Sequence, residues 1–252
     1  MYLSDCRGTC ILSKESANLY NNIFSMVTLR ALEYILAFIL VPYLLRVLGP
    51  SNFGAVVFMQ GLMGYLVLVV NYGFNLTAPR ALARADEEDI SFVFSVYMWA
   101  RILLWISVTG VFFFIYEGLR VFFQVEMDMP LFWAVYMMVI GAVIFPVWFF
   151  QGIQQMRYIT ILNLIGRLVT MIGIFVWVKG PEDYVLSGFL QSCTPVFAGI
   201  CSLFLIHRKF PGILQLPRWS ELKRVYGEGW QIFLSTLAIN LYTASDVVGL
   251  GL

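Results

Sequence analysis

The sequence has little charge: Asp, Glu, Lys and Arg make up 12% of its 252 residues, whereas 60% of the residues are hydrophobic. A soluble domain carries about 25% charged residues and about 45–50% apolar ones. A water-soluble protein of this length could not cover its surface with so few charges. A lipid-facing surface does not need them, because lipid tails solvate apolar side chains. The composition therefore predicts a membrane protein.

Other scarcities argue against several kinds of chemistry. The net charge is +1, without the clustered basic face that nucleic-acid binding requires, so we expect no nucleic acid among the partners. The four cysteines form no CxxC pair, and the single histidine, His207, has no carboxylate beside it. We therefore expect no metal site, no cofactor and no enzyme activity. No signal peptide is visible, so the first membrane helix is expected to direct insertion.

Long apolar stretches fill most of the chain. About 20 apolar residues of helix cross a bilayer core about 30 Å thick. Seven stretches have this length: 24–45, 54–78, 90–116, 130–150, 158–178, 184–206 and 229–250. Open strands cannot cross, because their backbone groups would be unpaired in hydrocarbon, and the stretches lack the alternation of a barrel. The sequence predicts an all-α, polytopic membrane helix bundle with about seven transmembrane helices.

Lys and Arg are unevenly divided between the loops, and cytoplasmic loops normally carry the excess. With a cytoplasmic N-terminus, only three fall in outside loops: Arg46, Arg120 and Lys179. Ten fall inside: Arg7, Lys14, Arg80, Arg84, Arg157, Arg208, Lys209, Arg218, Lys223 and Arg224. We predict a multi-pass protein whose N-terminus is cytoplasmic.

The longest polar segment between spans is 207–228. Within it, Trp219, Leu222 and Tyr226 have helical spacing, which fits a short amphipathic helix at the cytoplasmic surface. An ordinary basic loop fits the segment equally well. The predicted organisation has four parts: an N-terminal cytoplasmic tail (1–20), a six-helix lobe (21–206), an interlobe loop or amphipathic helix (207–228), and the first helix of a second lobe (229–252).

Three arginines lie inside predicted spans: Arg30, Arg101 and Arg167. Each costs about 3 kcal/mol at the bilayer centre, so such residues usually face protein or a wet cavity. Arg30 lies near the cytoplasmic end of its helix, where it could snorkel or pair with Glu33. Arg101 lies near mid-depth, and Tyr97 and Trp105, on the same helix face, could stack on its guanidinium group.

Uncharged polar residues also follow helical spacing. Thr160, Asn163, Arg167 and Thr170 form a stripe on the fifth span. Similar sets occur on the second span (Gln60, Asn71, Asn75), the sixth (Ser187, Gln191, Thr194) and the seventh (Asn240, Thr243, Asp246). They either bond helix to helix or line a wet cavity. The predicted cavity residues are Arg30, Glu33, Gln60, Asn71, Arg101, Asn163, Arg167 and Asp246. Their modest positive excess suits an anionic polar substrate such as a diphosphate or an acidic sugar.

Four motifs resemble those of a known family, in the same order. Residues 41–54 (VPYLLRVLGPSNFG) resemble "PYLTRVLGPxxFG", and 71–75 with 78–84 (NYGFN, APRALAR) look like "GF…xxREIAR". Residues 149–156 (FFQGIQQM) are similar to "WFFQGxE", and 241–246 (LYTASD) resemble the start of the seventh span. The chain thus resembles, over about residues 18–252, the Wzx-type O-antigen and repeat-unit flippases of the multidrug/oligosaccharidyl-lipid/polysaccharide exporter superfamily. Gln154 stands where the family has an acid, which weakens any role tied to that acid.

The resemblance implies the N-terminal lobe of a two-lobe transporter in the bacterial inner membrane. It implies an undecaprenyl-diphosphate-linked oligosaccharide as substrate, a central cationic cavity, alternating access, and partners among polysaccharide assembly proteins and membrane lipid.

Family members have about twelve or more spans, whereas this chain ends within the seventh. We therefore expect a truncated chain that translocates nothing alone. In the complete transporter, replacing Arg101 or Arg167 by Ala is expected to stop transport without loss of the protein.

Two alternatives remain. A cation-coupled multidrug or cation antiporter of the same superfamily would want an acidic cavity, which only Glu33 and Asp246 offer. A coupling cation could still use those acids in a flippase. A membrane enzyme acting on lipid-linked sugars is less compatible with the sequence, because the loops are too short for a catalytic domain.

Overall fold

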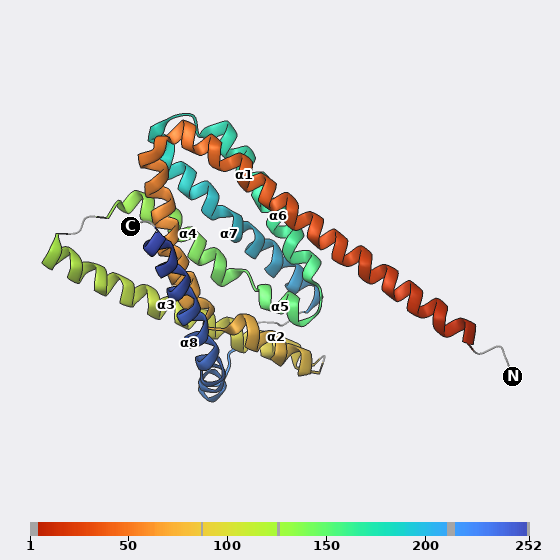
Figure 1. Ribbon diagram of the computed structural model, residues 1–252. Coiled ribbons are helices and arrows are strands. Elements are labelled where there is room, and N and C mark those ends of the chain that lie inside the picture. Colours follow the sequence, from red (N-terminus) through yellow and green to blue (C-terminus); the bar gives the residue numbers. More distant parts are fainter. Residues whose placement is uncertain (1–4, 87, 125–126, 211–214, 251–252) are drawn as a thin grey trace.

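The computed structural model describes residues 5–86, 88–124, 127–210 and 215–250; side chains are described for 31–86, 88–122, 124, 127–210 and 215–240. The described elements are all helical (Figure 1): α1 (Asp5–Asn71), α2 (Phe74–Arg84), α3 (Ile90–Phe123), α4 (Met129–Ile144), α5 (Val147–Gly152), α6 (Met156–Trp177), the short 3-10 helix η1 (Pro181–Asp183), α7 (Tyr184–Lys209) and α8 (Trp219–Leu250). The described residues contain no strand, and the predicted all-α fold class is confirmed.

Five helical segments within the described residues are long and apolar enough to cross a membrane: Ala31–Arg84, Ile90–Phe122, Met129–Gly152, Met156–Trp177 and Pro181–Lys209. The first contains two of the predicted spans, because the chain turns back inside it. The predicted seventh span, 229–250, lies in α8, whose side chains after Asn240 are outside the described set. The polytopic helical bundle is therefore confirmed.

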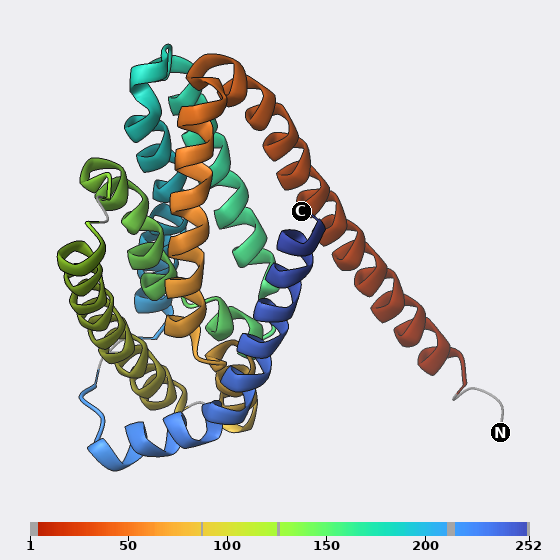
Figure 2. The ribbon, with the colours of Figure 1, turned by 60° about the vertical axis from the view of Figure 1, so that its left-hand side comes forward.

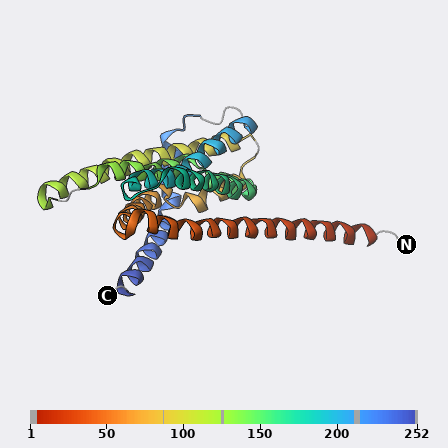
Figure 3. The same ribbon diagram turned by 90° about the horizontal axis from the view of Figure 1, so that it is seen from above.

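The reversal within α1 is at Gly49, whose backbone angles (φ 78°, ψ 162°) belong to a region that side chains rarely allow. Two hydrogen bonds hold the turn against the end of α6 and η1. The Tyr43 hydroxyl donates to the Val178 carbonyl oxygen (2.9 Å), and Asn52 Nδ2 donates to that of Pro181 (2.9 Å). Figure 1 shows the two arms of α1 meeting at this turn, and Figure 3 shows the first arm extending away from the bundle.

Two predicted spans are interrupted in the structure. The span predicted over 54–78 ends at Asn71, because Tyr72 (φ 43°) and Gly73 (φ 77°) turn the chain before α2 begins. The span predicted over 130–150 is divided into α4 and α5 at Phe145 and Pro146. Proline has no backbone N–H and cannot continue a helix without losing a hydrogen bond. Apolar residues continue through the break at Pro146 and resume after Asn75, so the hydropathy of each whole stretch did not locate the breaks.

The centre of the bundle is the packing of α4 against α7. Glycines let the two backbones approach closely, which is common in membrane bundles. A methyl group at Gly141 would lie 2.6 Å from the Val196 nitrogen, and one at Gly199 would lie 2.9 Å from the Ile144 side chain. The Asp128 side chain accepts from the Leu131 N–H (3.1 Å) and caps the start of α4. This rigid pair supports the helices around it.

Within the predicted interlobe segment 207–228, α7 continues to Lys209 and α8 begins at Trp219, so residues 219–228 are helical. Leu222 is buried, and the Tyr226 hydroxyl donates to the Ala100 carbonyl oxygen of α3 (2.8 Å). Trp219 does not join this apolar face; 62% of it is exposed. Figure 2 shows α8 crossing the lower end of the bundle before it turns upward.

Candidate functional site

A cavity of about 670 Å³ lies between both arms of α1 and the helices α2 to α7. Its wall combines apolar side chains with polar groups from several helices. Six of the residues predicted from the sequence line it: Glu33, Gln60, Asn71, Arg101, Asn163 and Arg167. The other two, Arg30 and Asp246, have side chains outside the described set. Residues far apart in the sequence thus meet around one space.

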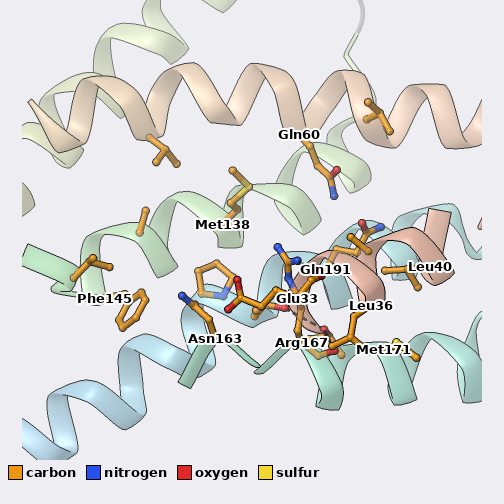
Figure 4. Close-up of a pocket in the computed structure, with 18 of the residues that line it drawn as sticks. Glu33, Leu36, Leu40, Gln60, Met138, Phe145, Asn163, Arg167, Met171 and Gln191 are labelled. Atoms are coloured by element: carbon orange, nitrogen blue, oxygen red, sulfur yellow. Dashed lines mark hydrogen bonds between the residues drawn. The ribbon is translucent and has the colours of Figure 1, made fainter. Parts of the chain in front are cut away.

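The polar stripes of α6 and α7 face each other across this cavity. Thr170 and Thr194 lie within hydrogen-bond distance (3.1 Å between hydroxyl oxygens), and both line the cavity. Gln60 and Asn163 also line it (Figure 4), and their side chains make no hydrogen bond within the described part of the chain. Helix-to-helix bonding and cavity lining, the two interpretations of the stripes, are therefore both present. Thr160 is buried outside the cavity.

Arg101 forms part of the cavity wall and is only 2% exposed. Its Nη2 atom donates to the Ala142 carbonyl oxygen (2.5 Å) and to Asn71 Oδ1 (2.8 Å). Its Nη1 atom donates to the Phe145 carbonyl oxygen at 3.4 Å. The guanidinium group is thus held by the helix end at the break between α4 and α5.

The position of Arg101 follows from this break. The last carbonyl groups of a helix have no partner within it, and in a membrane interior each unsatisfied one is costly. A cation at a helix C-terminus also interacts favourably with the helix dipole. Arg101 supplies both the donors and the charge, and therefore stabilises an interrupted helix at the bottom of the cavity.

The predicted stacking of Tyr97 and Trp105 on Arg101 is wrong within the described residues. The Tyr97 ring packs against Phe74 and Trp148, with centroids 5.6 Å away in each case. The Trp105 indole N–H donates instead to the Tyr136 hydroxyl (2.7 Å). Both aromatic groups find partners on other helices, because the guanidinium group extends toward the end of α4.

Arg167 occupies a different environment, at the seam between α6 and the first arm of α1. Its side chain is exposed, and its Nη1 atom donates to the backbone carbonyl oxygen of Glu33 (2.9 Å). Figure 4 shows Arg167, Glu33 and Asn163 in the same part of the cavity. A guanidinium group has five N–H donors. Arg167 therefore keeps most of its donors available to a molecule in the cavity.

The described cavity carries groups that can bind a polar ligand by charge and hydrogen bonds. It has two guanidinium groups, one carboxylate, several amide and hydroxyl groups, and a largely apolar remainder. Arginine binds phosphate or carboxylate groups through paired hydrogen bonds and stays charged when it loses water. Among the described residues, no group of three or more His, Cys, Asp or Glu side chains could hold a metal ion.

The carbonyl groups of Ala142 and Phe145 were missed from the sequence as partners of the cavity arginine. Pro146, inside a predicted span, was the available signal, because a proline there leaves helix carbonyls without donors. Asn75, Gln191 and Thr194 also line the cavity. They belong to the predicted polar stripes but not to the predicted cavity set.

Comparison with known proteins agrees with this architecture. Residues 19–252 match the family described as "Polysaccharide biosynthesis protein". The chain is 30% identical to a putative O-antigen transporter of Escherichia coli (strain K12) over 243 residues, covering 95% of this chain and 58% of that protein. It is 28% identical to a putative O-antigen transporter of Shigella dysenteriae over 232 residues, covering 90% and 57%.

The chain spans about three fifths of the length of these relatives. No solved structure matches it significantly. The family match covers nearly the whole chain, from residue 19 to residue 252. The chain therefore belongs to the polysaccharide biosynthesis protein family.

Proposed function

We propose that this chain is part of a transporter that moves an oligosaccharide linked to undecaprenyl diphosphate across the bacterial inner membrane. The observation that carries the proposal is the cavity, where Arg167 presents free guanidinium donors beside polar amides in an otherwise apolar wall. The relatives, which are named O-antigen transporters, support the same substrate class and a role other than catalysis.

The proposed substrate has two unlike parts. Its sugar and diphosphate head needs hydrogen bonds and positive charge, and its long tail needs hydrocarbon. A cavity of about 670 Å³ lies within the range of small-molecule sites, about 300–1,000 Å³, and could hold part of such a head. The tail would stay in the bilayer, beside the exposed apolar side chains of α1 and α6.

Movement would follow alternating access, in which one helical bundle rocks against another around a fixed site. The described helices provide one wall of that site. In the proposed orientation, with a cytoplasmic N-terminus, the lower surface carrying Arg80, Arg84 and Arg157 faces the cytoplasm. Arg167 would offset the charge of the diphosphate or of an acidic sugar in either state.

A cation-coupled drug antiporter is the second candidate, and Glu33 is the feature that favours it, since it lines the cavity. The same carboxylate could serve a coupling cation in the proposed flippase. The excess of arginine over carboxylate among the described lining residues favours an anionic cargo.

Complementation tests the proposal. The gene of the complete transporter that contains this chain is expressed in bacteria that lack their own O-antigen transporter, and surface polymer is measured together with membrane-inserted protein. Polymer should return with the wild-type gene and with Arg157→Glu, an exposed arginine outside the cavity, but not with Arg167→Glu. If the wild-type protein inserts into the membrane but restores no polymer, and the cells become resistant to cationic drugs, the antiporter would be favoured.

A further inference from the structure

A second cavity, of about 720 Å³, lies where α8 meets α2 and α3. It shares no lining residue with the first cavity. Close backbone approach holds α8 there: a methyl group at Gly229 would lie 2.9 Å from the Tyr72 carbonyl oxygen, and one at Gly73 would lie 2.7 Å from the Ile232 side chain. Figure 2 shows this part of α8 crossing beneath the bundle. A molecule bound here would contact α8 and the helices on which it docks.

The walls of this second cavity carry opposite charges on different helices. Arg80 and Arg84 lie one turn apart on α2, are exposed, and make no ion pair within the described residues. On α8, Arg224 lies between two acids, 3.4 Å from Glu221 and 3.8 Å from Glu228. The α8 wall thus has one more carboxylate than guanidinium group, and the α2 wall is positive.

The total charge of the lining is balanced. The start of α3 adds Asp89, so three guanidinium groups face three carboxylates. A lone anion would meet the carboxylates, and a lone cation would meet the guanidinium groups. A ligand with both charges a few ångströms apart would satisfy both walls.

The inner surface of the cavity is apolar and contains a buried hydroxyl group. Val93, Val96 and Ile232 contribute aliphatic surface. Thr77 is 8% exposed, and its hydroxyl group interacts with that of Tyr97.

Two tryptophans indicate the level of this cavity in the membrane. Trp219 and Trp230 are 62% and 51% exposed, and eleven residues, about three helical turns, place them on one side of α8. Exposed tryptophans concentrate at the membrane–water interface, where lipid headgroups lie. The residues of α8 that line the cavity, from Glu221 to Ile232, occupy the same stretch of helix.

We propose that this cavity binds the zwitterionic headgroup of a phospholipid with a primary amine, such as phosphatidylethanolamine. Arg80 and Arg84 bind the phosphate, and Glu228 accepts hydrogen bonds from the ammonium group. Bound lipid then joins α2 to α8. The site is independent of the transported substrate, whose diphosphate has no ammonium group to offer the carboxylates.

The test measures lipid binding to the purified, delipidated full chain in detergent, by native mass spectrometry. Phosphatidylethanolamine is compared with phosphatidylglycerol, which has no amine, and with phosphatidylcholine, whose quaternary amine has no N–H. A short prenyl diphosphate is added as a competitor. Phosphatidylethanolamine should bind about tenfold more tightly than the other two lipids, and the diphosphate should not displace it.

Three variants locate the site. Arg80→Ala with Arg84→Ala should weaken binding of phosphatidylethanolamine about tenfold or more, whereas Glu228→Gln should remove the preference for the amine. Arg157→Ala, an exposed arginine outside the cavity, should change neither. Equal binding of the three lipids, equal loss in the Arg157 variant, or displacement by the diphosphate would overturn the proposal. The last result would mark a loading site for the transported lipid instead.

Discussion

The two arginines of the main cavity do different work, although each stands in an apolar helix. Arg101 is nearly fully buried and donates to two backbone carbonyl groups and Asn71. Arg167 is exposed and donates to one backbone carbonyl group, that of Glu33. A charge inside a membrane protein can therefore complete the fold or remain available to a ligand. The hydrogen-bond partners of each arginine, rather than its position along the membrane normal, distinguish the two roles.

This comparison revises one sequence-based prediction. Loss of transport without loss of protein was expected for Ala at either position. The structure restricts that expectation to Arg167. At position 101, removal of the side chain leaves the Ala142 carbonyl oxygen near the end of α4 and Asn71 Oδ1 without their donor, so we now expect the stability of the fold to fall first.

The largest effect is expected from Arg101→Ala. Leaving a buried acceptor unsatisfied costs about 1–3 kcal/mol, and the Ala142 carbonyl oxygen and Asn71 Oδ1 both lose their donor, whereas the Phe145 carbonyl oxygen keeps the Val147 N–H. The melting temperature and the amount of membrane-inserted protein should both fall, as measured by fluorescence size-exclusion chromatography after heating. Arg101→Lys should fall less, because it keeps a charged donor. If Arg101→Ala is as stable as the wild type, the carbonyl groups at the end of α4 do not require the Arg101 guanidinium group.

A second change should partly repair the first. Pro146→Ala restores a backbone N–H four residues after Ala142. This N–H reaches the Ala142 carbonyl oxygen, which Arg101 otherwise binds, when Phe145 changes from its extended conformation (φ −86°, ψ 99°) to a helical one. In a double-mutant cycle, Arg101→Ala should cost about 1 kcal/mol less in the Pro146→Ala background. If the losses of stability in the two single variants simply add in the double variant, Arg101 does not stabilise the break between α4 and α5.

Arg167→Ala should have little effect on stability, because one hydrogen bond from an exposed side chain is lost, about 0.5–1.5 kcal/mol at most. Surface polymer should nevertheless fall about tenfold or more in the complementation assay, since a charged hydrogen bond to the substrate is lost. Arg167→Lys should recover part of the activity. Polymer at the wild-type level in the Ala variant would remove Arg167 from the substrate site.

The smallest contrast is between two asparagines that line the cavity. Asn71 accepts a hydrogen bond from Arg101, so Asn71→Ala should lower stability by about 1 kcal/mol. The Asn163 side chain has no hydrogen bond within the described residues, so Asn163→Ala should leave the melting temperature unchanged and lower only transport. The same pair of assays measures both, and a reversal of the two results would contradict the division.

Much of the fold follows from the sequence, because helix length and apolar composition are strong signals in a membrane protein. The turn between the first two predicted spans, which the structure places at Gly49, and the presence of six predicted polar residues in one cavity follow from local patterns. The breaks at Gly73 and Pro146 were missed, because only one or two residues mark each break within an otherwise apolar stretch. The two backbone partners of Arg101 were missed as well, since they lie 41 and 44 residues away at the end of another helix.

The central claim is that Arg167 serves the substrate while Arg101 serves the fold. Its most direct test is the amount of surface polymer formed per molecule of folded transporter in the Arg101→Ala and Arg167→Ala variants. We predict a value near that of the wild type for Arg101→Ala, whose loss is in folded protein, and a value about tenfold lower for Arg167→Ala. Equal losses per folded molecule in the two variants would contradict the claim.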